Sequence, residues 1–255
     1  MSSAPAWDKD GFPVTHPEPW GRHGAFTTIR VEGDPPRPLF LDAHLNRLEE
    51  SSSLLGMELI ATKEQILERL TVFLSSLLLP APFLLRICLF EDCLGFSSRP
   101  ANTGESSLTG KILRHLRPVP KAKSTADKEL YGRLNELDLT REDLLLVHPE
   151  EEVVLESATS NLVFAQGNHL IIPEQDILPG IVLGKLLEVI GRDFSLERTS
   201  PRLDELPTFD EIILCGSGRE ISSFAAIPEA DWQSRSEKTF LHLRETYGTL
   251  KADHA

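Results

Sequence analysis

One glutamate stands out for its surroundings. Glu156 ends the apolar run VVLE and is followed by the five small or polar residues SATSN, before a second apolar run begins at Leu162. A carboxylate is almost never left inside a fold unless a charged or hydrogen-bonding group pairs with it. We therefore expect a specific partner for Glu156.

Three lysines upstream of Glu156 are candidate nucleophiles. Lys121, Lys123 and Lys128 lie in or next to the segment RPVPKAKSTAD, whose prolines and polar residues break the periodic pattern around it. Such lysines are usually solvated, but a lysine in a partly dry environment can lose its proton and attack a carbonyl. The residues by themselves leave open which lysine would do so.

Two further segments carry groups that bind anions in other proteins. Arg47 lies near the start of an expected helix, in HLNRLEESSS. In ILPGIVLGKLL a turn precedes a helix whose first N–H groups, those of Ile181 and Val182, have no intrahelical acceptor. Such a helix start attracts a phosphate. A solvated arginine and a helix start that binds only water are the alternatives.

The segment CGSGREI adds a third possible anion site. Gly216, Ser217 and Gly218 expose backbone N–H groups with little steric cover, which suits a phosphate nest, although an ordinary β-turn has the same composition. Phosphate anchors, an amine and a carboxylate together are the attachments of pyridoxal 5'-phosphate. That cofactor binds through a lysine Schiff base and has a charged partner at its pyridine nitrogen.

At these segments the sequence resembles the class IV aminotransferase family. These fold type IV pyridoxal phosphate enzymes include branched-chain aminotransferases, D-amino acid aminotransferases and 4-amino-4-deoxychorismate lyase. The resemblance runs from about Gly24 to about Ser223 and rests on the order of five motifs, GAFTTIRV, FLDAHLNRL, LESATSN, ILPGIV and CGSGREI.

The resemblance implies roles for the matched residues. Arg47 would hold the cofactor phosphate, and Glu156 would meet the pyridine nitrogen. In the family, the resemblance implies, the Schiff-base lysine lies thirty-odd residues before this glutamate. Lys123 precedes Glu156 by 33 residues, Lys128 by 28 and Lys121 by 35, so we select Lys123. The expected cofactor-binding residues are Arg47, Lys123, Glu156, Asn161, Leu178, Ile181, Val182, Gly216 and Ser217, of which Lys123 and Glu156 are catalytic.

Substrate contacts are expected from a second group of residues, Phe26, Thr28, Arg86 and Gly218. Arg86 either meets a substrate carboxylate or forms a structural ion pair. Some positions depart from the family pattern. Val182 replaces a threonine, Lys128 stands where branched-chain enzymes place a tyrosine, and FEDCLGF lacks the arginine-glycine pair of D-amino acid enzymes.

Composition excludes several classes of partner. The formal charge of -13 repels nucleic acid and anionic membrane surfaces. The longest apolar run, LTVFLSSLLL, is too short to span a bilayer. The three cysteines have no paired spacing, so we expect them to be reduced and buried, with no metal site. The chain's start has no cationic and apolar targeting pattern. We expect a cytoplasmic protein.

Alternating strand and helix patterns predict a mixed α/β (α+β) fold in two lobes. The resemblance implies the fold type IV arrangement, a small N-terminal α/β domain and a larger C-terminal pseudo-barrel domain. We expect an irregular arm over residues 1–20, the small domain over 21–116, a linker over 117–122 and the cofactor-binding domain over 123–255. Among local signals, Thr62 and Gln65 form a capping box before a predicted helix.

Three functions are compatible with these observations. The leading prediction is transfer of the amino group of an amino acid to a 2-oxo acid, by a homodimer as the resemblance implies. The first alternative is 4-amino-4-deoxychorismate lyase, which releases pyruvate and 4-aminobenzoate; Thr28 stands where the lyase has a threonine facing its substrate. The second alternative is a non-catalytic protein that keeps the fold.

Overall fold

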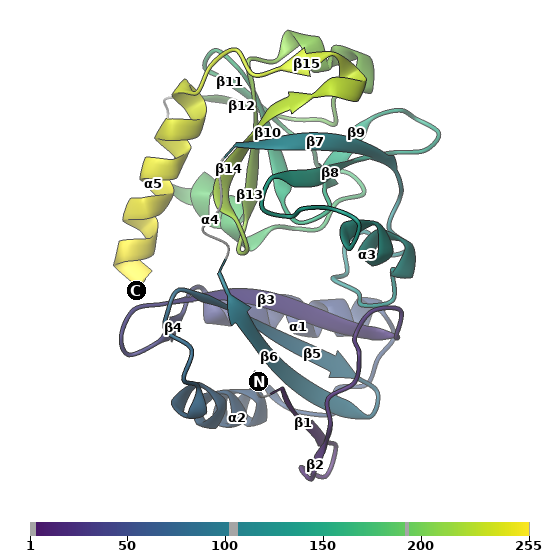
Figure 1. Cartoon of the computed structure of the whole chain (residues 1–255), viewed down its shortest axis with the longest axis vertical. Coiled ribbons are helices and arrows are strands. Elements are labelled where there is room, and N and C mark those ends of the chain that lie inside the picture. The colour runs from purple at the N-terminus through teal and green to yellow at the C-terminus, as the bar shows by residue number, and fades with distance from the viewer. Residues whose placement is uncertain (1–3, 102–106, 192–193, 255) are drawn as a thin grey trace. The chain divides into compact units, whose positions relative to one another are not determined.

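The computed structural model describes residues 4–101, 107–191 and 194–254 (Figure 1). Contacts between Cα atoms divide the chain into two units. Unit 1 comprises residues 1–101, 121–128 and 254–255, and unit 2 comprises residues 102–120 and 129–253. The segment 121–128 thus returns to the unit formed by the N-terminal part of the chain, and it brings Lys123 with it.

Unit 1 contains a six-stranded sheet with the order β2-β1-β6-β5-β3-β4. Each neighbouring pair in it is antiparallel. The strands are β1 (Pro5–Asp8), β2 (Pro13–Thr15), β3 (Gly24–Glu32), β4 (Arg37–Pro38), β5 (Phe83–Phe90) and β6 (Cys93–Pro100). The arm over residues 1–20 was expected to be irregular, and this is corrected: β1 and β2 lie within it, because β6 offers β1 a partner that is distant in sequence.

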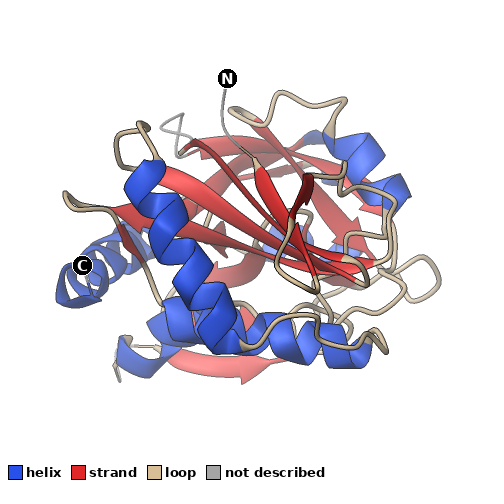
Figure 2. Ribbon diagram, turned by 90° about the horizontal axis from the view of Figure 1, so that it is seen from below, coloured by secondary structure: helices blue, strands red, loops and turns tan. Residues whose placement is uncertain are grey.

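Two helices of unit 1 pack on one face of this sheet. The helices are α1 (Leu41–Leu54) and α2 (Lys63–Ser76), which Figure 1 labels; Figure 2 draws all helices in blue and all strands in red. Their apolar residues share one buried cluster with alternate residues of β3, β5 and β6, among them Ile29, Leu85 and Phe96. Because side chains alternate along a strand, Thr28 and Arg86 belong to the other face. The predicted capping box at Thr62 is present.

Unit 2 contains a nine-stranded sheet with the order β12-β11-β10-β13-β14-β7-β8-β9, and β15 pairs with β14. The strands are β7 (Ser107–Arg114), β8 (Glu142–Val147), β9 (Val154–Ser157), β10 (Asn161–Gln166), β11 (His169–Ile172), β12 (Ser195–Arg198), β13 (Glu211–Gly216), β14 (Glu220–Ile227) and β15 (Trp232–Gln233). A short turn joins β9, at one end of this order, to β10, which lies near the other end. The sheet therefore curls.

The helices of unit 2 flank its sheet (Figure 1). They are α3 (Lys128–Leu134), whose first residue belongs to unit 1, α4 (Ile181–Val189), α5 (Lys238–His254) and the short 3-10 helices η1 (Leu203–Thr208) and η2 (Pro228–Ala230). The core includes Leu145, Phe164 and Phe224. Within the described residues no helix has the length and apolar character needed to cross a membrane. All three cysteines are free and buried, as predicted.

Candidate functional site

Lys123 is held against the edge of β3 in unit 1. The backbone N–H of Phe26 donates to the Lys123 carbonyl at 2.9 Å, and the Lys123 N–H donates to Ser51 Oγ at 3.0 Å. Its side chain is half-buried, with Nζ 4.8 Å from the centre of the Phe26 ring. Lys121 and Lys128 are exposed. Of the three candidate lysines, Lys123 is therefore the one in a partly dry environment.

Arg47 belongs to a buried polar network in the same unit. Its Nη2 donates to Thr27 Oγ1 at 3.1 Å, and Thr27 Oγ1 lies 2.7 Å from His44 Nδ1. Burial, with Arg47 and Lys123 nearby, holds the pKa of His44 well below its usual value. His44 is therefore neutral at pH 7. It fixes Thr27 without adding a further positive charge next to Arg47.

The substrate candidates Phe26, Thr28 and Arg86 lie together on unit 1. Thr28 and Arg86 are direct cross-strand partners. They line a cavity of about 140 Å³ with Leu84, Ser97, Ser98 and Arg99. The Arg86 guanidinium carbon lies 4.5 Å from the centre of the Trp20 ring and 5.9 Å from that of Phe26. Among the described residues no hydrogen-bond partner reaches the buried Arg86 Nε.

In unit 2 the partner of Glu156 is an arginine. Glu156 is the third residue of the buried strand β9, and Arg117 Nε donates to its Oε1 at 2.8 Å. Arg117 Nη2 also donates to the Ala158 carbonyl at 3.2 Å. Glu156 is 3% exposed and Arg117 is 7% exposed, so both charges are desolvated together. Such a pair is favourable only when its geometry is good, as it is here.

The segment after Glu156 is bonded to the turn before α4. Asn161 Nδ2 donates to the Leu178 carbonyl at 2.7 Å. A Cβ on Gly180 would lie 1.6 Å from Asn161 Oδ1, so only glycine allows this approach. The structure thereby brings Asn161 and Leu178 together. The Asn161 amide is engaged with backbone, and the side chain of Leu178 is buried.

The two expected phosphate-binding turns also belong to unit 2. Gly180 is the N-cap of α4, and no side chain within the described residues caps that helix start. Ser217 and Gly218 lie in the turn between β13 and β14, closed by Arg219 N–H donating to the Gly216 carbonyl at 3.3 Å. A Cβ on Gly216 would meet Ser160 Oγ at 2.6 Å. Both turns therefore pack against the segment that follows Glu156.

Several residues of these clusters were not found from the sequence. Arg117 falls at the start of the predicted linker, and nothing in its local pattern marks it as the partner of Glu156. Thr27, Ser51 and Trp20 are similar cases, because their roles depend on neighbours that are distant in the chain. The one available signal was the expectation that a buried carboxylate requires a cation.

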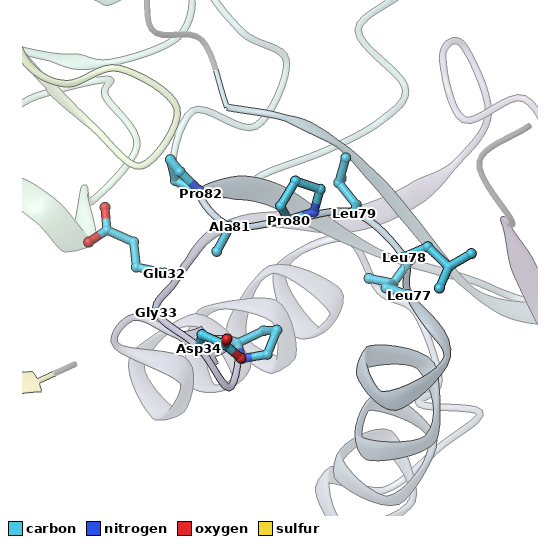
Figure 3. Close-up of a pocket in the computed structure, with 10 residues that line it drawn as sticks. Glu32, Gly33, Asp34, Leu77, Leu78, Leu79, Pro80, Ala81 and Pro82 are labelled. Atoms are coloured by element: carbon cyan, nitrogen blue, oxygen red, sulfur yellow. The ribbon is translucent and has the colours of Figure 1, made fainter.

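A larger cavity in unit 1 has a different chemistry. It has a volume of about 620 Å³ and lies between the turn after β3 and the segment that joins α2 to β5 (Figure 3). Glu32 and Asp34 contribute carboxylates, and Leu77 to Pro82 contribute an apolar wall. A phosphate or carboxylate ligand would be repelled there. The larger volume of this cavity therefore does not make it the candidate site for an anionic ligand.

Comparison with known proteins identifies the family. The model of class IV amino-transferases matches residues 24–227. The chain belongs to the class IV aminotransferase family. No curated protein sequence matches it. The family assignment confirms the predicted relationship and the expectation of a pyridoxal-phosphate-dependent enzyme.

Solved structures agree with this class IV aminotransferase fold. A branched-chain aminotransferase from Thermoproteus uzoniensis with norvaline has a TM-score of 0.81 and 18% identity, over 98% of this chain and 95% of that one. A hypothetical aminotransferase from Mycobacterium tuberculosis in a PLP-bound form has a TM-score of 0.77 and 18% identity, over 96% of this chain and 98% of that one. The branched-chain aminotransferase of Escherichia coli has a TM-score of 0.80 and 14% identity, over 97% of this chain and 94% of that one. The predicted fold class is confirmed.

The residues of this class IV aminotransferase fit a phosphorylated pyridine cofactor. Unit 2 offers an uncapped helix start and a glycine turn, which suit phosphate, and a buried carboxylate with its own arginine. Unit 1 offers a half-buried amine and the arginine Arg47. These are the donor types that such a cofactor requires.

Proposed function

We propose that this protein is an aminotransferase that moves the amino group of an amino acid to a 2-oxo acid with pyridoxal phosphate. The observation that carries the proposal is the buried Arg117–Glu156 pair, since it supports a charged carboxylate at the residue to which the resemblance assigns the pyridine nitrogen. Family membership and the structures of aminotransferases in PLP-bound form support the same conclusion.

The cofactor, when bound, supplies an aromatic ring that accepts the electron pair left when the substrate's α-carbon loses its proton. Glu156 holds a proton at the pyridine nitrogen, and Arg117 fixes the Glu156 carboxylate through Oε1. The Lys123 amine carries the proton to and from the α-carbon, because a tethered base has a high effective concentration. In this proposal Lys123 and Glu156 are the two catalytic residues.

Phosphate binding is divided among several donors. The Arg47 guanidinium contributes charge, while Ser217 contributes a hydroxyl, and the N–H groups of Ile181 and Val182 contribute the helix start. Val182 lacks the hydroxyl of the family's usual threonine, so its backbone N–H alone contributes. Leu178 would pack against the ring of the bound cofactor. Asn161 acts by holding the Leu178 carbonyl in place.

Arg86 binds the substrate carboxylate in this proposal. The cavity beside it is lined by a second arginine, Arg99, and by the hydroxyl-bearing residues Thr28 and Ser97. Stacking over Trp20 orients the guanidinium without neutralising it. Phe26 and Gly218 complete the substrate contacts. Two arginines at one small cavity favour an anionic substrate.

The lyase reaction is the second candidate, and Thr28 favours it, because this hydroxyl-bearing residue lines the Arg86 cavity. The two reactions differ in their need for an acceptor. Release of pyruvate from aminodeoxychorismate without any 2-oxo acid would establish the lyase. Consumption of an amino acid only when a 2-oxo acid is present would establish the transferase.

The decisive experiment is an absorption spectrum of the purified protein with pyridoxal phosphate, followed by a screen of L- and D-amino acids. The lysine-bound cofactor should give a visible band that amino acids deplete in wild type, and Lys123→Ala should lack that band. Wild-type protein with no band and no turnover would favour a non-catalytic protein. The domain boundaries, the homodimer and the cytoplasmic location predicted from the sequence belong to this proposal; light scattering tests the homodimer.

A further inference from the structure

Asp143 is a buried carboxylate that the proposed mechanism does not use. It is the second residue of β8 and is 0% exposed. Its Oδ2 accepts hydrogen bonds from Ser157 Oγ at 3.1 Å and from Thr159 Oγ1, and Arg219 Nε lies 3.5 Å away. Burial raises the pKa of Asp143, and Arg219 and these hydrogen bonds oppose that shift.

The partners of Asp143 come from two different segments. Ser157 and Thr159 lie between Glu156 and Asn161, whereas Arg219 lies in the turn that carries Ser217. Arg219 also joins the two segments directly, because its Nε donates to Thr159 Oγ1 at 3.3 Å and its Nη2 to the Glu142 carbonyl at 2.9 Å. Asp143 therefore lies at the centre of a network that links the segment after Glu156 to the turn of Ser217.

Such a network restricts the conformation of the Ser217 turn. That turn contains Gly216 and Gly218, which have no side chains that could make stabilising contacts. In the same turn, Arg219 forms an ion pair with Asp143 and a hydrogen bond with Thr159. Without the Asp143 charge, Arg219 would lose its ion-pair partner and the turn would gain conformational freedom. An anchor that must be ordered on binding contributes less affinity.

We propose that Asp143 is a positioning residue that holds the Ser217 turn, through Thr159 and Arg219, in the conformation that receives the cofactor phosphate. This inference rests on the proposed function, because it assigns that turn to phosphate. Asp143 does not touch the ligand itself. Its contribution should therefore appear in affinity for the phosphate group rather than in the chemistry of Lys123.

The test compares pyridoxal phosphate with pyridoxal, which lacks the phosphate, by absorption titration of the full chain. The variants are Asp143→Asn, Thr159→Val and Arg219→Gln. The matched control is Glu211→Gln, another buried carboxylate of unit 2, which accepts from Thr239 N at 2.9 Å and Phe240 N at 2.8 Å at the opposite end of β13. Thermal unfolding of each protein without ligand measures the general loss of stability.

We expect the three network variants to weaken pyridoxal phosphate binding about tenfold and pyridoxal binding less than threefold. The double variant Asp143→Asn with Arg219→Gln should weaken pyridoxal phosphate binding no more than the single variant with the larger effect, because both substitutions break the same network. Glu211→Gln should lower the unfolding temperature and leave both affinities within about threefold. If Asp143→Asn fails to fold, Thr159→Val and Arg219→Gln carry the test.

Two results would contradict the positioning role. The first is that the network variants bind pyridoxal phosphate as tightly as the Glu211→Gln control does. The second is that these variants weaken the binding of pyridoxal phosphate and of pyridoxal by the same factor. Either result with a wild-type protein that binds pyridoxal phosphate would leave the proposed function intact. A wild-type protein that does not bind pyridoxal phosphate would overturn both.

Discussion

The two units present charge in different ways. In unit 1, Lys123 lies over the Phe26 ring, Arg86 over the Trp20 ring, and Arg47 donates to a hydroxyl beside a neutral histidine. In unit 2 the cluster contains two buried ion pairs, Arg117 with Glu156 and Arg219 with Asp143. These unit 1 cations contact rings and hydroxyls, although unit 1 also contains ion pairs such as Arg30–Glu32, whereas the unit 2 cluster matches carboxylates with arginines.

This difference suits a division of labour. A cation on a ring or hydroxyl keeps most of its charge available to an incoming anion, such as a carboxylate or phosphate. A buried ion pair is already compensated, so it orients groups rather than attracting ligands. In the proposed function unit 1 therefore supplies the amine and the carboxylate-binding arginine, and unit 2 supplies a fixed carboxylate and fixed turns.

The largest expected effect tests the role of unit 1. Lys123→Ala should lower kcat more than about a thousandfold, because it removes the tethered base and the amine that binds the cofactor. Steady-state kinetics and the visible spectrum measure this. The exposed Lys121 provides the control, and Lys121→Ala should stay within about twofold of wild type. Loss of activity in Lys121→Ala together with near-normal activity in Lys123→Ala would refute the assignment of Lys123.

The buried pair of unit 2 provides the next test. Arg117→Met removes the countercharge of Glu156 and should lower the free energy of unfolding by about 3–5 kcal/mol in urea denaturation. Arg117→Met combined with Glu156→Leu removes both charges and should recover most of that stability while remaining inactive. A stable and fully active double variant would refute the catalytic assignment of Glu156.

A smaller effect is expected at the turn before α4. Gly180→Ala places a methyl group where Asn161 Oδ1 now lies, so the Asn161 bond to Leu178 should break. The free energy of unfolding should fall by about 1–3 kcal/mol, with weaker binding of pyridoxal phosphate. Gly184→Ala, within α4, meets no atom within 4 Å and should instead stabilise the protein slightly. Similar behaviour of the two variants would contradict this packing argument.

The smallest effect concerns the neutral histidine of unit 1. The pKa of His44 is lowered in the folded protein, so below pH about 6.5 the unfolded chain takes up a proton that the folded protein does not. Acid therefore favours unfolding, by at most about 1.4 kcal/mol per pH unit from this group. Denaturation between pH 7 and 5 should show a shallower dependence in His44→Gln than in wild type. A pH dependence as steep in His44→Gln as in wild type would contradict this role of His44.

Much of the fold could be read from local patterns. The capping box at Thr62 and the alternating strand that became β3 are properties of a few adjacent residues, and both are present. The short strands β1 and β2 could not be predicted, because their pairing depends on β6, which is far along the chain. Strand β6 itself was missed, since its polar end, SSRP, lacks the usual strand signal.

The candidate site divides in the same way. Glu156 could be singled out because a charged residue interrupts an apolar pattern, and Lys123 because its spacing from Glu156 resembles a family's. Arg117 and Asp143 could not, since each looks locally like one more charged residue at the end of a strand or segment. What distinguishes them is burial beside a particular partner.

The sequence by itself determined the family, the residue types available for chemistry and those elements with a strong local signal, because these follow from adjacent residues and the spacing of motifs. Only the tertiary structure decided that Arg117 meets Glu156, that Asp143 meets Arg219, and that Lys123 lies along the edge of β3. The reason is electrostatic and steric. A charge is stabilised by whichever groups lose water together with it, and folding brings those groups together from distant parts of the chain.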